Sequence, residues 1–70
     1  MMDMHQVTSS NIAAIGYDIA SEKLRIEFNS GTTYEYANVP FDEYTDLLNA
    51  DSVGKQFNQC VKNNYSFTQV

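Results

Sequence analysis

The sequence predicts an α+β fold in which a three-stranded antiparallel meander carries two helices packed on one face. Three observations predict it. Residues 23–28 alternate strictly between polar and apolar side chains, as a half-buried strand does. An Asn-Ser-Gly turn at residues 29–31 separates this segment from a second one that is rich in Thr and Tyr. From residue 41 onward, the apolar side chains recur at helical spacing instead.

The chain begins with seven residues, 1–7, that show no clear hydrophobic period. We expect them to form a loosely held N-terminal tail. Residues 8–70 then form a single domain, because the chain has no linker, internal repeat or low-complexity segment.

The first predicted hairpin joins a strand over residues 12–17 to the alternating strand over residues 23–28. A four-residue turn, residues 19–22, sets the pairing between them. It places Asp18 opposite Lys23, where their opposite charges pair across the strands. In this register Ala14 and Gly16 leave the outer face of the sheet flat, and three side chains of the first strand point to the core: Ala13, Ile15 and Tyr17.

The second predicted hairpin has a three-residue turn that ends at Gly31. Such turns usually end in a left-handed residue, which glycine adopts readily. This turn places Ile26 opposite Tyr34 on the core face and Arg25 opposite Glu35 on the outer face. The charge pair contributes about 0.2–1 kcal/mol. A two-residue turn would bring Glu35 to the core face, so we favour the three-residue turn.

Two short helices are predicted after the sheet. Pro40 suits the first helical position, and acidic residues follow it in the first turn, where the helix dipole favours them. The apolar stripe of this helix is Phe41, Tyr44, Leu47 and Leu48. Asp51 or Ser52 caps the second helix, whose apolar stripe is Val53, Phe57, Cys60 and Val61. Residues 65–70 are extended in character and predict a short C-terminal strand.

Composition limits what so small a chain does. Seventy residues, 43% of them hydrophobic and 19% charged, suit one folded domain with a thin core. Nine acidic residues against four basic ones give a net charge of −5, so a general nucleic-acid footprint is missing. One cysteine excludes an internal disulfide, and no apolar stretch is as long as a membrane span. We therefore expect a cytoplasmic protein without membrane association.

The residue pattern does not predict catalysis. Cys60 lies on the apolar stripe of a helix, and the single histidine, His5, lies in the N-terminal tail. A Cys–His nucleophile needs a base within hydrogen-bond reach of the sulfur, and a tetrahedral metal site needs more ligands than these two. The carboxylates are expected to be paired across the sheet or solvated on a helix. We expect no enzymatic activity, no cofactor and no metal.

Two tyrosines are the first candidate for ligand binding. Tyr34 and Tyr36 are two residues apart on a strand, so their side chains point to the same face. Aromatic rings on a sheet are surfaces on which the bases of single-stranded nucleic acid stack. The predicted register, however, turns this face toward the helices, which makes both tyrosines core residues with hydroxyls at the rim.

The start of the second helix is the other candidate. Ser52 offers a hydroxyl, Gly54 permits close approach, and Lys55 supplies a positive charge beside free backbone N–H groups, which together suit a phosphate or carboxylate. Lys62 lies seven residues further on, on the same side of the helix. The alternative is an ordinary helix cap, followed by a glycine that makes room for neighbouring backbone.

The order of these features resembles the KTSC domain, which is named for its occurrence at the C-terminus of some lysyl-tRNA synthetases and also occurs as a free-standing small protein. The resemblance runs from about Thr8 to Val70. The matching residues are Ser9 to Asp18, Leu24-x-Ile26-x-Phe28-x-x-Gly31, Tyr34-Glu35-Tyr36, Val39-Pro40, Tyr44-x-x-Leu47, Ser52-x-Gly54-x-x-Phe57-Asn58 and Tyr65. The central Tyr-x-Tyr is the hallmark of the family, and the order and spacing of the motifs together make the resemblance specific.

The resemblance implies a binding module whose family has an RNA-binding suggestion and no established activity. We therefore expect a non-catalytic module that binds RNA or tRNA, or a protein, and the acidic charge favours the protein. The flat outer face around Ala14 and Gly16, or an exposed strand edge, would be the contact. The alternative is a protein that binds or sequesters a small anion or nucleotide, as some phage proteins do, at the start of the second helix. Such a shallow pocket would lie between the subunits of a homo-oligomer.

Overall fold

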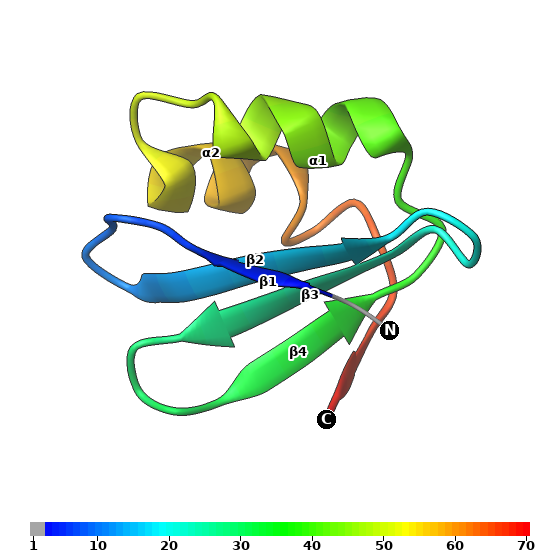
Figure 1. Cartoon of the computed structure of the whole chain (residues 1–70), viewed down its shortest axis with the longest axis horizontal. Helices are drawn as coiled ribbons and strands as arrows, with labels where there is room; N and C mark the ends of the chain where they lie inside the picture. The colour runs from blue at the N-terminus through cyan, green and yellow to red at the C-terminus, as the bar shows by residue number, and fades with distance from the viewer. Residues whose placement is uncertain (1–2) are drawn as a thin grey trace.

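The computed structural model describes residues 3–70, and within them the predicted α+β fold has a larger sheet than expected. Five strands form one antiparallel sheet in the order in which they occur along the chain. They are β1 (Met4–Gln6), β2 (Ile12–Asp18), β3 (Lys23–Phe28), β4 (Thr33–Tyr36) and β5 (Phe67–Gln69). The helices α1 (Phe41–Leu48) and α2 (Val53–Cys60) lie between β4 and β5 in the chain and cover the same face of the sheet (Figure 1).

The prediction of a tail over residues 1–7 is corrected by β1. Met4 pairs with Gly16, and Gln6 pairs with Ala14, at the edge of β2 that β3 leaves open. The strand has only three residues, all exposed, so its side chains carry no hydrophobic period from which a strand would be recognised. Backbone pairing with the open edge of β2 positions it instead. Met1 and Met2 of the predicted tail lie outside the described residues.

Both predicted hairpin registers are confirmed. In the first hairpin Tyr17 pairs with Leu24 and Asp18 pairs with Lys23. In the second, Arg25 pairs with Glu35, as the three-residue turn requires. Gly31 has a φ of 96°, in the left-handed region where glycine avoids the steric cost of a Cβ. The predicted C-terminal strand is also present, as β5, and pairs antiparallel with β4.

One predicted core position in β2 is wrong. The register shifts between Ile12 and Ala14, so that Ala13 is an extra residue in the strand. This β-bulge turns Ile12 as well as Ile15 toward the helices, and both are fully buried. Ala13 is therefore not the core residue that simple alternation predicts. Its carbonyl accepts a hydrogen bond from the backbone N–H of Val7, which extends the contact with the N-terminal segment.

The helices begin and end close to the predicted positions. Pro40, predicted as the first helical residue, is the N-cap of α1, so the helix begins one residue later than predicted. Ser52 caps α2, and its hydroxyl accepts the backbone N–H of Lys55 at 3.4 Å. The buried side chains between helices and sheet form one cluster: Ile12, Ile15, Leu24, Ile26, Tyr36, Val39, Tyr44, Leu47, Val53, Phe57 and Val61. This cluster leaves the opposite face of the sheet free to serve as a surface.

Candidate functional site

The structure places both tyrosines of the first candidate site, Tyr34 and Tyr36, on the face of the sheet that packs against the core. Tyr36 is only 3% exposed, and its ring lies edge-on to Phe57 of α2 at 5.5 Å between centroids. Tyr34 is partly buried, edge-on to Phe28 at 5.7 Å and to Phe67 of β5 at 5.2 Å. Burial raises the pKa of Tyr36, and the nearby Tyr34 adds to this shift. The two hallmark side chains thus pack together within the core face.

The residues at the start of α2 are largely engaged in local structure. The Ser52 hydroxyl is used by the helix cap. Gly54 is buried, and a Cβ atom there would lie 2.6 Å from Asn11 Oδ1 and 3.1 Å from Ser9 Oγ. Gly54 therefore has a packing role, as the alternative expected, but it makes room for two side chains of the loop before β2 rather than for backbone. Lys55 is exposed.

A shallow hollow of about 340 Å³ does lie beside this helix start. Its lining residues are Ala50, Asp51, Ser52, Lys55, Gln56 and Gln59. Lys62 is not among them; it is exposed beyond Cys60, the last residue of α2. Of the six candidate residues, the structure thus brings Ser52 and Lys55 to one hollow and Tyr34 and Tyr36 to the core face, and it does not join the two groups in a single pocket.

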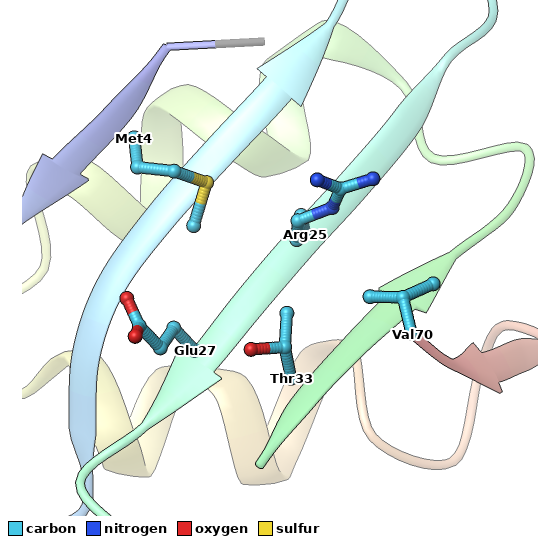
Figure 2. Close-up of a pocket in the computed structure, with 5 residues that line it drawn as sticks. All are labelled: Met4, Arg25, Glu27, Thr33 and Val70. Atoms are coloured by element: carbon cyan, nitrogen blue, oxygen red, sulfur yellow. The ribbon is translucent and has the colours of Figure 1, made fainter. Parts of the chain in front are cut away.

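The other hollow lies on the face of the sheet opposite the helices. It has a volume of about 360 Å³ and is lined by Met4, Arg25, Glu27, Thr33 and Val70. Figure 2 shows these five side chains in front of the sheet, with the helices behind it. They come from β1, β3, β4 and the residue after β5, so the hollow spans the width of the sheet. We call this surface the outer face.

Ala14 and Gly16 of β2 explain why the outer face is hollowed. Ala14 pairs with Glu27, and Gly16 pairs with both Met4 and Arg25. Register partners project to the same face, so two minimal side chains lie between long ones. The sequence predicted this flat region correctly, but not that its neighbours would leave Ala14 only 4% exposed.

One charge cluster dominates the outer face. Arg25 Nη2 donates to Glu35 Oε2 at 2.6 Å, and Lys23 Nζ lies 3.7 Å from Glu35 Oε1. A single carboxylate therefore serves two cations. Arg25 Nε is buried and makes no hydrogen bond, the one such side-chain atom among residues 3–70. A buried donor without a partner costs about 1–3 kcal/mol, so Glu35 satisfies this guanidinium only in part.

The predicted ion pair between Asp18 and Lys23 does not form, although their backbones are in register. Asp18 turns into its own hairpin turn instead, where Oδ2 accepts the Ser21 hydroxyl at 2.9 Å and Oδ1 accepts the Ala20 N–H at 3.1 Å. These hydrogen bonds, that from Ser21 first, hold the pKa of Asp18 below its ordinary value. Lys23 is consequently free to approach Glu35. Local turn bonds are a common competitor for Asp side chains, so the strand register alone did not decide the partner.

Sequence reasoning found part of the outer-face hollow and missed the rest. Arg25 and Glu27 were predicted to point outward by the alternation of β3. Met4 was missed because it was assigned to the tail, and Val70 because nothing indicated where the last residues would pair. Hydrogen bonding by the backbone positions both, and the side-chain sequence carries no signal of it.

The described residues limit the other chemistries. Within residues 3–70, no group of three or more His, Cys, Asp and Glu side chains is arranged to hold a metal ion. In the same part of the chain, neither helix has the length and apolar character that a membrane crossing requires. The geometry therefore defines a small α+β domain with one helix-covered face and one open, shallowly hollowed face.

The chain belongs to the KTSC domain family, whose sequence model matches residues 8–65. This confirms the resemblance seen in the motifs. The crystal structure of a KTSC domain protein from Yersinia pestis is similar to this fold, with a TM-score of 0.97 at 31% identity, covering 100% of this chain and 99% of that one. The fold is therefore that of the family throughout the chain.

Two relatives in sequence show where the domain occurs. An uncharacterized protein of Stutzerimonas stutzeri (strain A1501) is 44% identical over 54 residues, which are 77% of this chain and 76% of that protein. A lysine–tRNA ligase of Nostoc punctiforme is 41% identical over 61 residues, which are 87% of this chain but 11% of the ligase. The domain thus occurs both in small proteins and as a small part of a synthetase.

Proposed function

We propose that the chain is a non-catalytic binding module that recognises a protein partner through the outer face of its sheet. The observation that carries the proposal is the hollow on that face, whose lining combines the apolar side chains of Met4 and Val70 with the charged side chains of Arg25 and Glu27. Met4 and Val70, both exposed, supply apolar contact on its walls. Glu27, exposed at its side, supplies a carboxylate. Mixed apolar and polar contacts of this kind are typical of protein interfaces.

The charges on the outer face favour a protein over RNA. Its two cations, Lys23 and Arg25, both lie against Glu35, and Glu27 adds a further negative charge. Affinity for nucleic acid depends on cations that are free to contact phosphates. A relative is named as a lysine–tRNA ligase, which keeps RNA as the competing class of partner. The same experiment can distinguish the two classes.

A photo-crosslinking experiment tests the proposal. A benzophenone amino acid replaces Glu27 in the hollow, and in a matched control it replaces Asp46, which is exposed on α1. After irradiation in a lysate of the native host, we expect an adduct from position 27 alone whose size is unchanged by nuclease. A nuclease-sensitive adduct would show RNA as the partner. Equal labelling from both positions would rule out the outer face.

The alternative, a binder of a small anion or nucleotide, depends on the hollow beside Ser52 and Lys55. Its support is weaker, because Ser52 is already used as a cap and Asp51 brings a negative charge to the lining. If it is correct, inorganic phosphate or nucleoside triphosphates should raise the melting temperature, and Lys55→Ala should abolish that increase while Lys62→Ala leaves it unchanged. Size-exclusion chromatography with the ligand would show whether a second subunit completes the site.

A further inference from the structure

Three aromatic side chains gather at the end of the molecule where the β2–β3 turn meets the start of α1. The rings of Tyr17 and Tyr44 are stacked, with centroids 5.0 Å apart. Phe41 lies 5.8 Å from Tyr17 and 6.0 Å from Tyr44. Tyr44 is buried, whereas 47% of Phe41 is exposed. Phe41 therefore has one face held by two rings and the other open to solvent.

Hydrogen bonds between the neighbouring segments fix this end of the molecule. Tyr17 Oη donates to the Val39 carbonyl at 2.6 Å, and the Val39 N–H donates to the Glu22 carbonyl at 2.9 Å. Val39 lies just before α1, so the two bonds tie the end of β2 and the β2–β3 turn to the segment that leads into that helix. The exposed ring of Phe41 is thus presented by a pre-organised support, which lowers the entropic cost of binding.

The exposed apolar surface extends beyond Phe41. Ile19, in the β2–β3 turn, is 70% exposed, and Leu48 at the end of α1 is 36% exposed. Leu48 follows Phe41 by seven residues, so both lie on the same side of the helix. Single exposed apolar residues are ordinary, but a group beside an aromatic cluster indicates an interaction surface. We call the surface formed by Ile19 and Phe41, beside Tyr17 and Tyr44, the aromatic end; Leu48, the last residue of α1, lies outside it.

The rim of the aromatic end is acidic. Asp42 is exposed in the first turn of α1, and Asp18 and Glu22 flank Ile19 in sequence. Burial raises the pKa of Tyr17, and the negative charges of Glu22 and Asp18 raise it further. The electrostatic potential at this cluster is therefore negative. Asp3 acts in the same way on Tyr44, again second to burial.

Of the described cations, Lys23 lies nearest to the aromatic end, because it follows Glu22 and pairs in register with Asp18. Lys23 and Arg25 are paired with Glu35 on the outer face. Lys55 belongs to α2, and Lys62 follows that helix. The aromatic end therefore combines an apolar centre with negative charge around it and no compensating lysine or arginine from these positions.

We propose that the aromatic end docks a basic amphipathic segment of a partner protein, with an apolar side chain on Phe41 and lysine or arginine side chains facing the acidic rim. Buried aromatic anchors supply most of the binding energy at such interfaces, and complementary charge supplies specificity and association rate. The acidic rim disfavours nucleic acid, whose phosphates it repels, and a second copy of this chain, whose own rim carries the same charge. This surface is separate from the outer face, because it lies on the side of the sheet that the helices cover.

An NMR titration with a synthetic amphipathic peptide of lysine and leucine tests the proposal. We expect shifts of the resonances of Ile19, Phe41 and Tyr17 on addition of this peptide, and none with the matched peptide of glutamate and leucine. Phe41→Ser should weaken binding by about tenfold, which corresponds to about 1.4 kcal/mol. Phe67→Ser is the matched control. Phe67 is also about half exposed, at 54%, and also packs on two tyrosines, but it belongs to β5 and not to the aromatic end. This control should bind as the wild type does.

Two further variants keep the result interpretable. Ile19→Ser changes a side chain that is 70% exposed, so it should preserve the fold and still weaken binding. Asp42→Asn should weaken binding at low salt, with the exposed Asp51→Asn as its charge control. Shifts confined to Met4, Glu27 and Thr33 would place the peptide on the outer face and overturn the proposal. Equal losses in Phe41→Ser and Phe67→Ser, or equal binding of both peptides, would overturn it as well.

Discussion

Gly54→Ala separates a packing role from a ligand-binding role at the start of α2. A Cβ at this position would lie 2.6 Å from Asn11 Oδ1, closer than such atoms approach. Asn11 Oδ1 is not free to swing away without loss, because it accepts the Ser9 hydroxyl at 3.1 Å. Ser9 Oγ in turn accepts the backbone N–H groups of Asn11 and Ile12, both at 3.4 Å. The methyl group would therefore disturb a small hydrogen-bonded loop.

Two opposing effects decide the magnitude. Alanine is a better helix former than glycine by about 1 kcal/mol in a helix interior, and by less in the first turn, where Gly54 lies. Overpacking a well-filled site costs about 1–3 kcal/mol. The overpacking effect is larger, so we expect Gly54→Ala to lower the free energy of unfolding by about 1 kcal/mol. In a domain of this size that lowers the melting temperature by about 4–8 °C.

Chemical denaturation of a double-mutant cycle measures this effect. In an Asn11→Ala background the clashing oxygen is gone, so Gly54→Ala should cost nothing or stabilise slightly. The exposed Gln59→Ala on α2 is the control for general effects of alanine. A stabilising Gly54→Ala, or additive effects of the two substitutions, would refute the packing argument. Normal stability together with loss of phosphate binding would instead support an anion site.

Four further substitutions test the core, the outer face and the β2–β3 turn. Tyr36→Ala should lower stability by about 3–5 kcal/mol. Tyr36→Phe should reduce the loss of stability that the protein shows in alkali. Burial raises the pKa of Tyr36 above 10.0, so the neutral phenol contributes its full stability below pH 10.0, and that stability is lost as the pH rises through the raised pKa. Phenylalanine has no hydroxyl to ionise. If the free energy of unfolding of Tyr36→Phe falls in alkali as steeply as that of the wild type, this explanation is wrong. Glu35→Gln leaves Arg25 without its carboxylate. Because the Arg25 side chain is 37% exposed, the substitution should cost only about 0.2–1 kcal/mol in thermal denaturation, and less in high salt; an unchanged melting temperature at low salt would count against the cluster. Ser21→Ala should raise the pKa of Asp18, measured by NMR titration, and should reduce the stability that is lost as the pH falls below 3.8. An unchanged pKa of Asp18 would contradict the hydrogen bond from the Ser21 hydroxyl.

The sequence predicted the inner part of the fold and the C-terminal strand, and it missed β1 and the bulge in β2, for a physical reason. The register of β2, β3 and β4 follows from alternation and from turn length, and Gly31 adopts the left-handed φ that its turn requires. These signals are local, so they can be recognised in one chain. The bulge at Ala13 and the strand β1 depend on pairing with residues elsewhere in the chain. Their side chains have no hydrophobic pattern from which this pairing can be predicted.

The same distinction explains the candidate sites. Ser52 and Gly54 were recognised as a motif because cap and glycine signals are local, and Tyr34 and Tyr36 because they alternate. The outer-face hollow is assembled from three strands and the residue that follows β5, and it could not be recognised in this way. Ala14 and Gly16 indicated the centre of the hollow. Its walls include Met4 and Val70, whose positions depend on how the two edge strands, β1 and β5, pair with the rest of the sheet.

The two strands that sequence reasoning found hardest to place are therefore those that complete the outer face. Replacing Met4 by Ser removes an apolar wall from the hollow while the backbone pairing that holds β1 persists, since the pairing does not depend on the side chain. We expect a fold and melting temperature close to the wild type, but a weaker photo-crosslink from position 27. A loss of stability above 2 kcal/mol would mean that the Met4 side chain holds β1 in place, and that the hollow exists to anchor a strand rather than a partner.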